Sequence, residues 1–159
     1  MINIQKAQLE DLQEILKLQK IAYQSEAQIH NDFTIQPLTQ TLDQVIEEFH
    51  KGVILKAVKD GVIVGSVRAS FTVKHSADKN ENTVCIGKLM VDPKHQGNGM
   101  GRQLLAAIEK EFSGCRFELY TACKSNRNMH LYETSGYVRF KEETDEAGIR
   151  FAFFEKNNL

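Results

Sequence analysis

The sequence predicts a single domain of the α/β (α+β) class, in which a mixed β-sheet of about six to seven strands is flanked by about four helices. Short β-branched runs recur along the chain between turn residues, as expected for strands. Other segments place apolar residues three and four positions apart, which is typical of amphipathic helices. The 159 residues, 42% hydrophobic and 26% charged, suit one core. We therefore treat residues 1–159 as one domain.

The N-terminal part is expected to contain one strand and then one helix. Residues 2–7 form the strand, and residues 9–23 place most of their leucines and isoleucines on one helical face. Residues 30–39 are expected to be irregular, because Pro37 opposes a helix.

A second helix is expected directly after this irregular segment. Thr41 and Gln44 form a possible capping box, and apolar residues follow at helical spacing. Gly52 is expected to end the helix.

The middle of the chain is predicted to form a long hairpin and then a third strand. Two β-branched runs within residues 53–73 surround Asp60-Gly61, a strong signal for a tight hairpin turn. A polar loop, residues 74–82, leads to a strand over residues 83–91. Gly87 lies inside that strand, which suggests a β-bulge or a close approach by another backbone.

The C-terminal part is predicted to alternate helices and strands before a closing hairpin. The expected elements are a helix at residues 101–112, a strand at 116–121, a short helix at 126–136, and hairpin strands at 137–144 and 149–155.

Composition excludes several classes of protein. A formal net charge of -1 gives no general attraction to nucleic acid or to an anionic membrane, so we expect neither as a partner. The N-terminus lacks a basic and apolar leader, so a cytoplasmic protein is expected. Cys85, Cys115 and Cys123 form no C-x-x-C pair and the histidines are scattered, so we expect reduced thiols and no metal site.

The most informative stretch places glycines at positions 97, 99 and 101, directly before a helix. Glycine backbone can approach a ligand closely, and the first N–H groups of a helix attract anions. A phosphate-binding loop and an ordinary flexible loop both fit this pattern. The spacing matches neither the phosphate-binding P-loop nor the dinucleotide fingerprint.

Two motifs resemble those of the GNAT superfamily, the GCN5-related N-acetyltransferases. The first is Gln96-Gly97-Asn98-Gly99-Met100-Gly101 after Leu89-Met90-Val91, which is similar to the acetyl-CoA loop of that family. The second is similar to the motif N-x-x-x-x-x-Y-E-x-x-G-[FY], and it consists of Asn126, Tyr132, Glu133, Gly136 and Tyr137. The predicted order of elements resembles the family over essentially the whole chain.

This resemblance implies a fold and a cofactor site. A bulged central strand should separate from its neighbour, and acetyl-CoA, as co-substrate, should lie in the gap. Its pantetheine arm is expected on the main chain of Leu89, Met90 and Val91. Its pyrophosphate is expected on Gln96, Gly97, Asn98, Gly99, Met100, Gly101 and Arg102. Asn126 is expected either beside the cofactor or as the cap of a helix.

The resemblance also implies the reaction, in which a primary amine of a small molecule, peptide or protein attacks acetyl-CoA directly in a ternary complex. Tyr132 aligns with the family's general acid, although an aromatic residue packed in the core is the alternative. Glu118 is the best candidate for the base, with a structurally paired carboxylate as the alternative.

Other candidates for the base and for the acceptor site come from several parts of the chain. His75, Glu81 and Asp32 are weaker candidates for the base, and a chain of water molecules is also possible. An acidic segment containing Glu26 and His30 could attract a cationic amine. Arg68 is expected on a solvated strand face, with the acceptor site as the less favoured alternative.

Two other functions stay open at this point. One is a catalytically weak CoA-binding regulatory module, and the other is a structural interaction domain whose glycine loop binds nothing. A homodimer is possible, although no feature of the sequence decides it.

Overall fold

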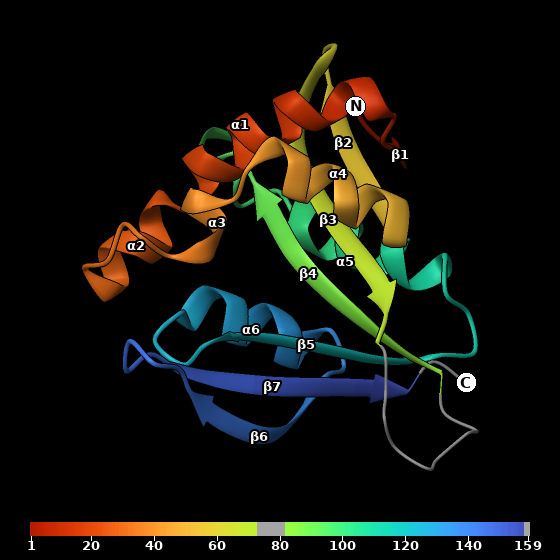
Figure 1. Ribbon diagram of the computed structural model, residues 1–159. Helices are drawn as coiled ribbons and strands as arrows, with labels where there is room; N and C mark the ends of the chain where they lie inside the picture. Colours follow the sequence, from red (N-terminus) through yellow and green to blue (C-terminus); the bar gives the residue numbers. More distant parts are fainter. Residues whose placement is uncertain (73–81, 158–159) are drawn as a thin grey trace.

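The computed structural model describes residues 1–72 and 82–157, which form one seven-stranded mixed sheet with helices on both faces (Figure 1). His75, Glu81 and almost all of the expected polar loop lie outside the described residues. The strands are β1 (Ile2–Lys6), β2 (Val53–Lys59), β3 (Val62–Phe71), β4 (Thr83–Val91), β5 (Arg116–Ala122), β6 (Val138–Thr144) and β7 (Arg150–Asn157). The α-helices are α1 (Leu12–Ala22), α2 (Gln24–His30), α3 (Gln36–Thr39), α4 (Leu42–Lys51), α5 (Met100–Lys110) and α6 (Asn126–Thr134), and short 3-10 turns η1 (Leu9–Asp11) and η2 (Pro93–His95) precede α1 and α5.

The sheet has the strand order β1-β2-β3-β4-β5-β7-β6, and its one parallel pair, β4 with β5, lies in the middle. These two strands pair only over Thr83–Cys85 and Arg116–Glu118. Beyond that short ladder they diverge, so that Figure 1 shows the sheet opening between β4 and β5. Beyond the ladder neither strand has a strand partner across the opening among the described residues, so backbone groups that face it can pair with a ligand.

A β-bulge in β4 lies where the strands begin to diverge. Arg68 of β3 pairs with Gly87, but Ser66 pairs with Met90, so two residues of β4 stand opposite one residue of β3. Lys88 adopts the left-handed conformation there, with φ of 48°. The predicted bulge is therefore present, but the unusual backbone belongs to Lys88 rather than to Gly87.

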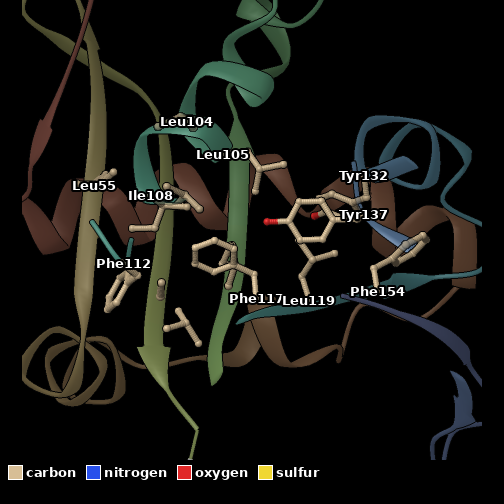
Figure 2. Close-up of a cluster of buried hydrophobic side chains, with 14 of the residues drawn as sticks. Leu55, Leu104, Leu105, Ile108, Phe112, Phe117, Leu119, Tyr132, Tyr137 and Phe154 are labelled. Carbon is tan, nitrogen blue, oxygen red and sulfur yellow. The ribbon is translucent and has the colours of Figure 1, made fainter. Parts of the chain in front are cut away.

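Two hydrophobic clusters hold the helices on opposite faces of the sheet. The helix α5 covers one face with Leu104, Leu105 and Ile108, and its cluster continues across the ladder between β4 and β5 to Phe117 and Phe154 (Figure 2). The helices α1 and α4 cover the other face through a smaller cluster. The larger cluster joins the two halves of the sheet on one face, while the opening separates β4 from β5 at one end.

The local turn and cap signals are confirmed. Asp60 and Gly61 both have positive φ, 51° and 77°, as a tight hairpin turn requires. Thr41 and Gln44 form the expected capping box at the start of α4, and Gly52 follows its last residue.

The expectation of an irregular segment at residues 30–39 was wrong in part. The segment contains the one-turn helix α3, and α2, which the sequence analysis missed, ends at its start. Pro37 lies in the first turn of α3, where a missing N–H has no intrahelical partner to lose. A proline near the start of a helix therefore does not exclude it.

Arg68 lies in a buried polar network, which corrects the prediction of a solvated strand face. Only 5% of Arg68 is exposed, and its Nη1 donates to Oε2 of Glu48 at 2.6 Å while its Nη2 donates to Oε1 of Gln19 at 2.7 Å. Gln40 accepts a further bond from Arg68 and donates to Glu48. Burial lowers the pKa of Arg68, whereas Glu48 opposes that change. The network ties α1 and α4 to β3 one residue before the bulge.

Replacing Glu48 with Gln should destabilise the protein, because it leaves the buried guanidinium of Arg68 without a counter-charge. Removal of one partner from a buried ion pair costs about 3 to 5 kcal/mol, and a value near the lower end is expected since Glu48 is partly exposed. Urea unfolding measures the change in the free energy of unfolding. The matched control is Glu47→Gln on the exposed face of the same helix, with little expected change. Equal stability of the two variants would contradict this role for the network.

Candidate active site

Two cavities open where β4 and β5 diverge, and they adjoin each other. The first, the glycine-loop cavity, has a volume of about 470 Å³ and lies between β4, the loop before α5, and the start of α6. Its lining includes every residue predicted for the cofactor except Asn98: Leu89, Met90, Val91, Gln96, Gly97, Gly99, Met100, Gly101, Arg102 and Asn126. The structure therefore brings together residues that are separate in sequence.

The backbone of the glycine loop has the form that an anion site needs. Gly97 and Gly99 have positive φ, 89° and 74°, and Gly99 is the residue that caps the N-terminus of α5. A Cβ atom built on either glycine would meet no other atom within 4 Å, so the backbone is open to an approaching group. The following N–H groups are at the positive end of the helix and have no intrahelical acceptors.

Polar side chains surround this loop. His95 lines the cavity, and its Nδ1 is a buried atom that lacks a hydrogen-bond partner among the described residues. Gln96 accepts a hydrogen bond from Arg127. Arg102 donates to Oγ1 of Thr134 at 2.9 Å, so its charge is held at the rim. The unpaired Nδ1 of His95 and the free N–H groups at the start of α5 suit a polar, anionic ligand better than an apolar one.

Asn126 is the first residue of α6, and the residue in the cap position is Ser125. The alternative that Asn126 caps the helix is therefore not what the structure has. Asn126 instead lines the glycine-loop cavity.

The second cavity, the aromatic cavity, has a volume of about 690 Å³ and lies beside the diverging end of β5. Its aromatic lining comes from the start of α2, from β5, from α6 and from β7: Tyr23, Tyr120, Tyr132 and Phe151. Ionisable groups at its walls are Glu26, His30, Asp32, Lys88 and Asp145. A cavity with apolar walls and a few charged groups can hold an amine and bind its substituent.

Tyr132 lies at the wall of the aromatic cavity and also in the core. It is 6% exposed, and its ring contacts those of Tyr137 and Phe154 with centroids 6.2 and 5.8 Å away (Figure 2). Burial raises the pKa of its hydroxyl, and the nearby charge of Glu26 raises it further. The phenol is therefore protonated at neutral pH, as a proton donor must be.

Glu118 is not part of either lining. Its carboxylate pairs with Arg116, which also pairs with Glu155. The alternative of a structurally paired carboxylate describes this position, and the role of Glu118 as base stays a prediction that the geometry does not support. Arg68, committed to its buried network, also lies outside both linings.

Four residues lie where the two cavities meet, and the sequence analysis did not name two of them, Tyr23 and Asn128. Tyr23, Glu26, Leu89 and Asn128 line both cavities. Oγ of Ser125 donates to Oε1 of Glu26 at 2.7 Å, which ties the start of α6 to α2. The acidic segment that contains Glu26 and His30 indicated Glu26 as a candidate. Nothing in the sequence positions of Tyr23 or Ser125 indicates that they would lie beside Glu26.

Two negative observations complete the site. Across residues 1–72 and 82–157, no group of three or more His, Cys, Asp or Glu side chains is placed to hold a metal ion. None of the helices in the described part of the chain is long and apolar enough to cross a membrane.

Comparison with known proteins identifies the family. The domain model described as the acetyltransferase (GNAT) domain matches residues 18–157. The L-amino acid N-acyltransferase MnaT of Escherichia coli K12 is 31% identical over 101 residues, which span 62% of this chain but only 56% of that protein.

Solved structures have the same fold. An N-acetyltransferase of Staphylococcus aureus Mu50 has a TM-score of 0.78 at 18% identity, covering 100% of this chain and 99% of its own. The protein yncA of Salmonella typhimurium, solved with its cofactor acetyl-CoA, has a TM-score of 0.76 at 16% identity, covering 100% of this chain and 95% of its own.

Proposed function

Because the chain belongs to the GNAT family of acetyltransferases, we propose that it transfers the acetyl group of acetyl-CoA to a primary amine by direct attack in a ternary complex. The observation that carries this proposal is the pair of adjoining cavities. One ends at the glycine loop, whose N–H groups suit an anion, the other is lined by aromatic and ionisable groups, and residues of β4 line both. This arrangement suits a phosphorylated thioester on one side and an amine on the other.

Acetyl-CoA fits the glycine-loop cavity by its chemistry. The N–H groups of Gly97 to Arg102 would bind the pyrophosphate, and the orphaned Nδ1 of His95 offers one more polar contact. The backbone of Leu89 to Val91 has no strand partner on the β5 side among the described residues and would pair with the amides of the pantetheine arm, although the carbonyl oxygen of Val91 accepts from the amide of Gln96 at 3.4 Å. When bound, acetyl-CoA supplies an activated acyl group.

Residues of the chain would assist the transfer in two ways. Lys88 and Leu89 have no register partner in either neighbouring strand, so their N–H groups can donate to the carbonyl oxygen as negative charge develops on it. Tyr132 would donate its phenolic proton to the departing sulfur.

The aromatic cavity would hold the acceptor. MnaT is named for L-amino acids, and this cavity contains both the carboxylate of Glu26 and the ammonium of Lys88, which suit the two charged ends of an amino acid. We therefore place L-amino acids first, ahead of other small amines and peptide amines. The cysteines are thiols, which fits action in the reducing cytoplasm.

The proposed function is tested with purified protein, acetyl-CoA and a panel of L-amino acids, alkylamines and short peptides. Free CoA thiol should be released only when a suitable amine is present, and mass spectrometry should find the acetylated product. Binding of acetyl-CoA without turnover on any amine would favour a regulatory CoA-binding module instead. Absence of CoA binding would favour a structural domain.

Replacing Gly99 with Val should abolish CoA binding measured by calorimetry, because the side chain would occupy the space open to the phosphates. The matched control is Gly61→Val in the β2–β3 turn, since φ is 77° there and 74° at Gly99. Both variants should lose about 1 to 3 kcal/mol of stability from backbone strain. Tight CoA binding by the Gly99 variant would contradict the assigned phosphate site.

Replacing Tyr132 with Phe should lower kcat by about 10²-fold while the ring keeps its packing. The control is Tyr137→Phe, whose ring lies beside that of Tyr132 and whose hydroxyl donates to Glu109 at 2.8 Å. That variant should lose stability of about 1 kcal/mol but keep its turnover. An unchanged kcat in the Tyr132 variant would remove the tyrosine from the mechanism.

A further inference from the structure

We propose that Glu26 is the general base that takes the proton from the acceptor ammonium. This inference rests on the proposed function and assigns the proton-accepting step to a residue that lines both cavities, whereas Glu118 lines neither. An alkylamine has a pKa of about 10, so at neutral pH its nitrogen is mostly protonated and cannot attack a thioester. A proton acceptor must therefore stand where the amine meets the acyl group.

Glu26 stands at that meeting place. It lines both cavities, and its side chain is 19% exposed, so it is accessible from the cavities but largely withdrawn from bulk solvent. Ser125 orients one carboxylate oxygen through the 2.7 Å hydrogen bond to Oε1. Oε2 lies 3.9 Å from Nε2 of His30, one helical turn along α2. One oxygen is thus anchored, while the other can accept a proton and has an imidazole beside it.

The other carboxylates near the cavities are already engaged. Asp32 accepts hydrogen bonds from the N–H and the hydroxyl of Thr34 at 2.8 and 2.5 Å, which hold its pKa below the ordinary value and make it a weaker base. Asp145 accepts from the N–H of Ile149 at 2.9 Å. Glu48 is bound to Arg68 and serves the buried network.

The groups that face Glu26 divide the proton transfers between two residues. Tyr23 lies between α1 and the start of α2, His30 is the last residue of α2, Ser125 directly precedes α6, and Tyr132 lies within α6. Burial raises the pKa of both tyrosine hydroxyls, and the neighbouring carboxylate of Glu26 raises it further, so these phenols keep their protons at neutral pH. Glu26 is suited to accept a proton and Tyr132 to donate one.

The protons balance over the reaction. The ammonium loses one proton to Glu26, and its lone pair then forms the C–N bond to the acyl carbon. As the C–S bond breaks, the sulfur takes the phenolic proton of Tyr132, and the resulting phenolate takes the second proton of the nitrogen. The proton held by Glu26 then passes to solvent, so one proton is released for each amide formed.

The experiment compares Glu26→Gln with the wild-type protein on two acceptors at pH 7. One is the most active alkylamine of the panel, which is protonated, and the other is hydroxylamine, which is already neutral. The variant should lose about 10²-fold in kcat on the alkylamine and little on hydroxylamine. Its rate on the alkylamine should rise with pH as the free amine becomes more abundant. Its affinity for acetyl-CoA by calorimetry should match that of the wild type.

Control variants separate a base from a docking charge. Asp32→Asn removes another carboxylate of the aromatic cavity, and it should change the KM for the alkylamine more than kcat. Glu26→Asp keeps the carboxylate and should retain more activity than Glu26→Gln, and melting temperatures check that each variant is folded.

The outcomes that overturn the inference differ from those that overturn the proposed function. Unchanged kcat on the alkylamine, or an equal loss on both acceptors, would remove Glu26 as the base while acetyl transfer by the wild type still stands. A wild-type protein that acetylates no amine would overturn the proposed function, and the inference with it.

Discussion

The short parallel ladder between β4 and β5 is the constraint on which both cavities depend. Pairing stops at Cys85 and Glu118, and the bulge at Lys88 follows in the part of β4 that has no partner in β5. A strand that turns away leaves its backbone groups unpaired, which is costly unless a ligand or water pairs with them. The buried network around Arg68 fastens the helices α1 and α4 to β3 beside this point, while the larger hydrophobic cluster holds the two halves of the sheet together. Contacts on both faces of the sheet therefore hold the strands in place beside the opening.

Groups of opposite polarity lie on different sides of this opening. The glycine loop presents backbone N–H groups, whereas α2 presents the carboxylate of Glu26 at the junction with the aromatic cavity. An anionic cofactor and a cationic amine would thus approach from different sides and meet beside Tyr132. Burial keeps Tyr132 of α6 protonated. Ser125, which directly precedes α6, donates a hydrogen bond that orients the carboxylate of Glu26.

Local signals in the sequence were sufficient for most of the fold, and together with the family resemblance they indicated most of the residues that line the glycine-loop cavity. The hairpin turn at Asp60-Gly61, the cap at Thr41 and the glycines before α5 each depend on backbone preferences of a few neighbouring residues. The acceptor side depends instead on contacts between distant segments. Alternation along β5 placed Glu118 on the face opposite to Phe117, but it could not reveal that Arg116 occupies the carboxylate.

The surroundings of Arg68 and Glu26 could not be predicted, because both depend on segments that are distant in the sequence. A lone arginine in a strand usually faces water, and only the packing of α1 and α4 shows that this one is buried. A glutamate in a polar segment is usually solvated, and only the approach of Ser125 from the other end of the chain brings it to the junction.

The central claim is that acetyl-CoA lies in the opening between β4 and β5, and a crystal structure of the complex tests it most directly. The account predicts the pyrophosphate on the N–H groups before α5, the pantetheine arm along Leu89 to Val91, and the acyl carbon between Tyr132 and Glu26. A cofactor bound on another face of the sheet, or an acyl group far from both of these side chains, would contradict it.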